Sequence, residues 1–158
     1  MQIARVKRLK YEARHMCMKR IPLNAFAIIA DHGSMPLDWT SSELATGLAC
    51  YRSGEFFEAH EHWELAWLLL SEPEKSFLQT LIQITAAMHH AQRGNHAGAL
   101  SLLRRVQTKL AACPPEFGGI AVAPLRDEVS LWLESCSQPQ ADHPATSPQI
   151  RPLPLPKA

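Results

Sequence analysis

The segment between Phe77 and Ala91 constrains the fold of this chain most strongly. Its apolar residues alternate spacings of four and three, which places them on one face of an α-helix; they are Phe77, Leu81, Ile84, Met88 and Ala91. Gly94 follows, and glycine is typical just past the end of a helix. A helix with such a face has to pack it against other elements, so the segment predicts a helix in a helical core.

Four further helices are expected around this one. They are expected over residues 41–54, with Ser41 or Ser42 as cap and Gly54 as stop, over 55–70, from the cap Asn95 to the break at Pro114-Pro115, and from about 124 onward. The loops between successive helices are short, which indicates antiparallel neighbours. The sequence therefore predicts an all-α, single-domain antiparallel bundle of about five helices, without strands.

The start of the helix that contains Phe77 carries two agreeing signals. Ser71 as N-cap with Glu74 three residues later forms the pattern of a capping box. Pro73 stands in the first turn, where the missing amide hydrogen is not needed. We expect this helix to begin there.

The two ends of the chain differ in composition from the domain predicted at residues 21–136. Residues 1–20 hold seven Lys and Arg side chains and the single acid Glu12, and we expect a solvated basic arm. Residues 137–158 hold six prolines among Ser, Gln and Ala. Such a segment cannot hold a helix, so we expect a disordered or polyproline-like tail.

Composition excludes several classes of protein. The net charge is +1, from 16 basic and 15 acidic residues, so no overall field favours nucleic acid or anionic lipid. The four cysteines are far apart and form no Cys-x-x-Cys pair, as expected for reduced thiols in a cytosol. No run approaches the roughly 18–20 apolar residues that span a bilayer. We expect a cytoplasmic protein with no membrane segment and no nucleic-acid partner.

Chemistry-bearing residues concentrate in the helix predicted at 55–70. Winding it at about 100° per residue places His60 and Glu64 on the arc of Trp63 and Trp67. A buried carboxylate costs several kcal/mol without a compensating partner. His60, one turn before Glu64, can supply a hydrogen bond or share a cation with it.

Two histidines and a carboxylate with open positions are a known metal arrangement. His60, Glu64 and His90 are the candidate ligands for zinc, iron or manganese, although the sequence leaves open whether His89 or His90 faces the site. Glu61, Trp63, Trp67 and Gln83 would form its wall or support the ligands. The remaining histidines are placed on the surface or in loops, with no assigned chemistry: His15, His32, His62, His96 and His143.

An alternative hypothesis makes the protein a non-catalytic interaction module. His60 and Glu64 would then be a buried pair that fixes helix packing. Leu65 and Leu69 lie opposite the tryptophan arc, and a second apolar face is often covered by another subunit. This hypothesis predicts a homodimer.

Two sequence blocks resemble the domain of unknown function 309 family of bacteria and archaea. The first is the hallmark His-x-x-x-Glu-x-x-Trp, present as His60-Glu-His-Trp-Glu64-Leu-Ala-Trp67 after Gly54-Glu-Phe-Phe-Glu58-Ala. The second runs from Phe77-Leu-Gln-Thr-Leu-Ile-Gln83 through His90-Ala-Gln-Arg-Gly-Asn95, with Thr80 where the family has glycine. The resemblance implies an all-α fold, self-association and a metal-binding role for the hallmark residues, and it implies no substrate.

Overall fold

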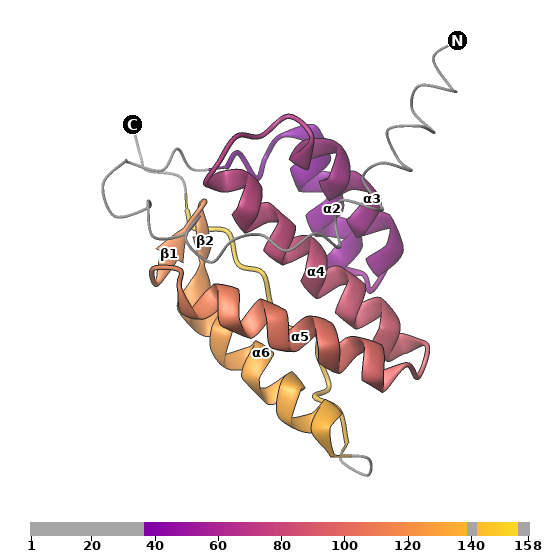
Figure 1. The fold of residues 1–158 in the computed structure, drawn as a ribbon. Helices are drawn as coiled ribbons and strands as arrows, with labels where there is room; N and C mark the ends of the chain where they lie inside the picture. The colour runs from indigo at the N-terminus through magenta and orange to yellow at the C-terminus, as the bar shows by residue number, and fades with distance from the viewer. Residues whose placement is uncertain (1–36, 139–141, 155–158) are drawn as a thin grey trace.

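The computed structural model describes residues 37–138 and 142–154, so the basic arm predicted at residues 1–20 lies outside the described residues (Figure 1). In the described part, five α-helices follow one another: α2 (Ser42–Arg52), α3 (Phe56–Trp67), α4 (Glu74–Gln92), α5 (His96–Ala111) and α6 (Val122–Ser137). None of these helices is both long enough and apolar enough to cross a membrane.

Each helix packs on the next one along the chain, and α4 lies between the pair α2 and α3 and the pair α5 and α6 (Figure 1). The apolar face predicted for α4 is buried, because Phe77, Leu81, Ile84 and Met88 are at most 1% exposed. Because α4 has helices on both sides, the polar residues between these apolar positions are buried as well. The predicted all-α helical bundle is confirmed.

The helix ends follow the predicted signals, with one exception. Gly54 and Gly94 adopt the left-handed backbone at φ of 78° and 73°, and the side chain of Asn95 accepts a hydrogen bond from the Gly98 amide. The prediction of a capping box at Ser71 is wrong, because Pro73 is the N-cap residue of α4 and makes no side-chain cap hydrogen bond. The Ser71 backbone carbonyl accepts from the Lys75 amide, and the carboxylate of Glu72, not that of Glu74, accepts from the Ser76 amide at 3.2 Å.

An aromatic cluster joins α2 to α3. The ring of Trp63 stacks on Tyr51, with centroids 5.9 Å apart, and meets Trp39 edge to face. Gly47 makes this possible, since a Cβ atom there would overlap the indole of Trp63. The cluster fixes which face of α3 is turned toward α2.

A short hairpin that the sequence did not predict connects α5 to α6. Its strands are β1 (Glu116–Phe117) and β2 (Ile120–Ala121), joined by two glycines with positive φ. The carbonyl of Gly118 accepts from the indole Nε1 of Trp39 at 2.8 Å. Paired glycines permit so tight a turn, and two-residue strands are too short to show an alternating pattern.

The prediction of a disordered C-terminal tail is wrong for residues 142–154. The carbonyl of Pro148 accepts from the hydroxyl of Tyr51 at 2.7 Å, and Ile150 is 2% exposed. Beyond it, the tail pairs with β2 through an isolated bridge between Pro152 and Ile120. Proline lacks a donor but keeps its carbonyl and a fixed φ, so a proline-rich segment can lie in a groove that supplies donors.

Candidate metal site

The candidate site lies on α3, where residues four apart share a face. Glu64 is 5% exposed, and Nε2 of His60 lies 3.6 Å from Oε1 of Glu64. A buried carboxylate needs a compensating group close by, and the imidazole stands within reach. The structure thus brings the predicted pair together.

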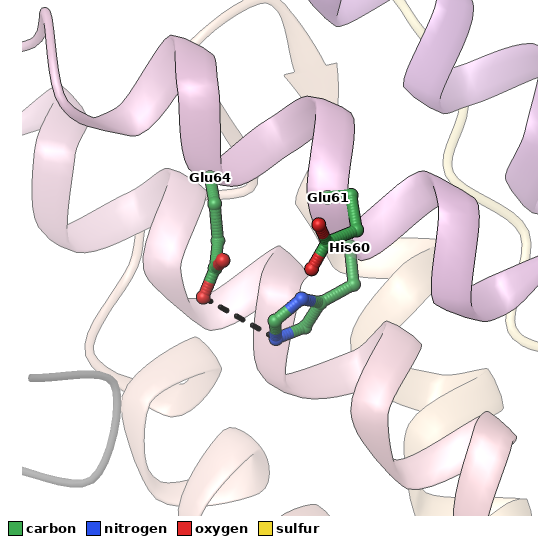
Figure 2. Close-up of side chains that lie close together, drawn as sticks. All are labelled: His60, Glu61 and Glu64. Carbon is green, nitrogen blue, oxygen red and sulfur yellow. Dashed lines mark ion pairs between the residues drawn. The ribbon is translucent and has the colours of Figure 1, made fainter. Parts of the chain in front are cut away.

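Glu61 joins this pair as a third potential ligand. Figure 2 shows its carboxylate turned toward the ring of His60, and all three side chains extend from the same helix. One ligand atom each from His60, Glu61 and Glu64 lie within 4.8 Å of one another. Glu61 was predicted only to support the ligands, because helical winding alone separates it from the arc of His60 and Glu64; its flexible side chain bridges that gap.

The two tryptophans of the motif differ in their surroundings. Trp63 is fully buried and donates from Nε1 to the backbone carbonyl of Leu44 on α2 at 3.2 Å. It is therefore a core residue that holds α3 against α2. Trp67 lies at the end of α3, where the ammonium of Lys75 sits 4.4 Å from its ring centroid.

His90 is not brought into the group of His60, Glu61 and Glu64. Its Nδ1 lies 2.9 Å from Nδ2 of Asn95, at the turn between α4 and α5. His89 is the histidine of α4 beside α3, since its ring centroid lies 5.9 Å from that of Phe57. The rotation of α4 about its own axis decides which of the two histidines lies beside α3, and the sequence does not determine that rotation.

Gln83 also lies away from the predicted place. Its Oε1 accepts a hydrogen bond from Nζ of Lys109 on α5 at 3.0 Å. The stripe of α4 that holds Gln83 therefore faces α5, so this amide does not orient a ligand on α3. Thr80, the departure from the family pattern, is fully buried, and its hydroxyl donates to the Ser76 carbonyl of its own helix.

His62, which the sequence analysis placed on the surface, connects two helices. Its Nδ1 lies 2.7 Å from Oε2 of Glu43 on α2, and both side chains are over a third exposed. An exposed pair of this kind contributes little stability. It still fixes His62 on the side of α3 away from His60, which makes His62 a useful control residue.

None of the three described cysteines is an activated nucleophile. Burial raises the pKa of Cys113 to about 12, and burial also raises the pKa of Cys50 and of Cys136. For Cys50 the nearby carboxylates of Glu55 and Glu58 act in the same direction. The thiolate is the reactive form of cysteine, and a raised pKa makes it scarce at neutral pH.

Comparison with known proteins assigns this part of the chain to a family. Residues 44–102 match the model described as Domain of unknown function (DUF309). The match includes most of α2, all of α3 and α4 and the first part of α5, so it contains the group on α3. This region is a DUF309 domain, as the resemblance of its two motif blocks implied.

A relative from Aquifex aeolicus (strain VF5) is described as an uncharacterized protein. It is 30% identical to this chain over 77 residues, which are 48% of this chain and 23% of that protein. The chain thus spans about a quarter of the length of the relative it matches.

Proposed function

We propose that this chain binds a divalent transition metal through His60, Glu61 and Glu64. The observation that carries the proposal is the convergence of one imidazole and two carboxylates, whose ligand atoms lie within 4.8 Å of one another. Zinc, iron and manganese all accept this mixture of nitrogen and oxygen ligands. Glu61 takes the place that the sequence analysis gave to His90.

The arrangement favours an open site over a closed structural one. All three ligands come from residues 60–64 of one helix, so they can occupy only one side of an ion. Structural zinc sites are enclosed by four protein ligands, whereas sites that act on substrates keep positions for water or substrate. We therefore propose a metal site with room for an exogenous ligand.

Metal analysis of the purified protein tests this proposal. Untagged protein prepared without chelator is compared by elemental analysis with His60→Ala, Glu61→Ala and Glu64→Ala. His62→Ala is the matched control, because this histidine lies on the same helix outside the group. We expect near-stoichiometric metal in the wild type and in the control, and a large loss in the three site variants.

Thermal unfolding of the same proteins distinguishes the metal site from a packing pair. If His60 and Glu64 only fix helix packing, the variants lose stability and contain as much metal as the wild type. That result would replace the metal site with the structural interpretation. A metal site predicts that His60→Ala lowers bound metal while the chain stays folded.

A second candidate function, homodimer formation, rests on the exposed apolar residues of α3. Leu65 is 39% exposed and Leu69, just past the helix end, is 86% exposed. Apolar side chains that gather on one face mark interaction surfaces more often than isolated ones do. We propose a second copy of this chain as the partner.

We also propose a cytoplasmic location. The four cysteines are widely spaced along the chain, and reduced thiols are typical of proteins in that compartment. Alkylation of the protein in cell lysates, followed by mass spectrometry, tests it; extensive disulfide formation in freshly lysed cells would contradict it.

A further inference from the structure

Two histidines far apart in the sequence meet outside the α3 site. His96 is the first residue of α5, and His143 belongs to the segment that follows α6. Nε2 of His143 lies 3.1 Å from Nδ1 of His96, and the ring centroids are 4.7 Å apart. His96 lies in the region that matches the family model and His143 lies outside it, and the proposed site on α3 contains neither residue.

The other ring nitrogen of His143 is held by Ser135 of α6. The Ser135 hydroxyl donates to the carbonyl of Trp132 at 3.0 Å, and its oxygen lies 3.1 Å from Nδ1 of His143. Because the one hydroxyl hydrogen is used by the carbonyl, Nδ1 of His143 is the donor to this oxygen. The lone pair of His143 then lies on Nε2, the nitrogen that is 3.1 Å from Nδ1 of His96.

Stacking on Trp132 fixes the plane of the same ring. The indole and the imidazole are nearly parallel, at 13°, with centroids 5.4 Å apart. Nδ1 is thus oriented by Ser135 and the ring plane by Trp132, which leaves Nε2 with a defined direction. Metal-binding histidines are oriented in this way, through a hydrogen bond from their second ring nitrogen.

We propose that His96 and His143 form a second metal site, selective for divalent ions that prefer imidazole nitrogen, such as zinc. An ion about 2.0–2.1 Å from each nitrogen spans a pair 3.1 Å apart with an angle of about 100° at the ion. That angle lies between the octahedral and tetrahedral values. When the ion enters, the hydrogen on Nδ1 of His96 moves to Nε2 of the same ring by exchange with water, so that both facing nitrogens bind the ion through lone pairs.

The surroundings leave room for the rest of the coordination sphere. His96 is exposed, and a pocket of about 500 Å³ opens beside His143, lined among others by Trp132, Arg52 and Gln149. Water can therefore complete the shell around an ion held by two protein ligands. Such an ion would join the C-terminal segment to α5 and restrain residues 142–154 on the bundle.

Calorimetric titration with Zn²⁺ tests the second site. The untagged full chain is freed of metal and titrated in a non-coordinating buffer with a phosphine reductant. We expect the wild type to bind one zinc equivalent more than either His96→Ala or His143→Ala. His62→Ala is the matched control and should bind as much as the wild type.

Ser135→Ala tests the positioning of the ring. This change leaves both ligands in place, so the zinc stoichiometry should stay and the affinity should fall roughly 10- to 100-fold. Far-UV circular dichroism of each metal-free variant checks the fold. Since His96 is exposed, His96→Ala is the variant that tests the site even if His143→Ala unfolds the tail.

The outcomes separate this site from the α3 site. Loss of one equivalent in His96→Ala but none in His60→Ala supports the histidine pair and contradicts the proposed function. The reverse result, with His96→Ala and His143→Ala both binding as much zinc as the wild type, overturns the histidine pair alone. In that case the 3.1 Å contact is only a hydrogen bond between two rings.

Discussion

Residue 47 is glycine, and because it has no side chain, α2 and α3 can approach each other closely at this position. A Cβ atom at Gly47 would overlap Nε1 and Cδ1 of Trp63, whose side chain is fully buried. Neither helix can move away without disturbing the stacking of Trp63 on Tyr51. Gly47 therefore fixes the spacing of the helix that carries the candidate site.

Gly47→Ala should destabilise the protein by about 3 kcal/mol, at the upper end of the cost of overpacking a core. The measurement is the free energy of unfolding in urea. The double variant Gly47→Ala with Trp63→Ala is the matched comparison, because it removes the indole atoms that the new Cβ would overlap. If the changes in unfolding free energy of the two substitutions simply add, the overlap between residue 47 and Trp63 is not the cause of the destabilisation.

Cys113 gives a pH dependence whose sign is fixed by its burial. The folded pKa is about 12, whereas the ordinary value is near 9, so between these values the folded chain holds one proton more than the unfolded chain. Stability from this group is complete below pH 9 and is lost as pH rises toward 12. Tyr51, whose pKa burial also raises, acts in the same direction at higher pH.

We expect Cys113→Ala to flatten the fall in unfolding free energy between pH 9 and 11, by roughly 1 kcal/mol per pH unit at most. Urea unfolding at several pH values measures the slope. Equal slopes in the variant and the wild type would mean that the thiol ionises alike in both states.

The site residues show what local periodicity can predict. His60 and Glu64 were predicted because their spacing of four settles their relation within one helix. His90 and Gln83 were misplaced because their relation to α3 depends on how α4 is rotated, and all sides of its middle section are buried. Glu61 was not predicted as a ligand, because the spacing of residues along a helix does not show how a long side chain bends.

At the scale of elements, helix ends were predictable and the tail was not. Gly54, Gly94 and Asn95 act within a few residues of their own positions, so the sequence shows their effect directly. Residues 142–154 take their path from partners up to 97 positions away, such as Tyr51 for Pro148. Composition alone suggested disorder because it does not record such partners.

Ile150 is the anchor of this segment, and Ile150→Ala should cost about 2–5 kcal/mol of unfolding free energy, as for other buried aliphatic side chains. The side chain of Ile150 is 2% exposed. Leu131→Ala is the matched control, because Leu131 is 57% exposed on α6 and should change stability by less than about 0.5 kcal/mol. A tail that only rests on the surface would show similar small effects for both changes.

At the scale of the whole molecule, the exposed apolar surface is unevenly distributed. Of the five large apolar side chains that are exposed among the described residues, four lie within or just after α3. They are Phe57, Leu65, Leu68 and Leu69. The helix that carries the candidate metal ligands is therefore also the helix with most apolar surface left for a partner.

Leu65→Glu together with Leu69→Glu should convert a dimer to a monomer. Two carboxylates placed in an apolar interface lose hydration without gaining partners, and the matching surface of the second copy doubles the effect. Sedimentation equilibrium measures the mass, with Leu131→Glu as a control that places one carboxylate at an exposed leucine on α6. A mass that is the same in the wild type and the double variant would remove dimerisation through α3. If the double variant is monomeric and still holds metal, assembly and metal binding are separate properties of the same helix.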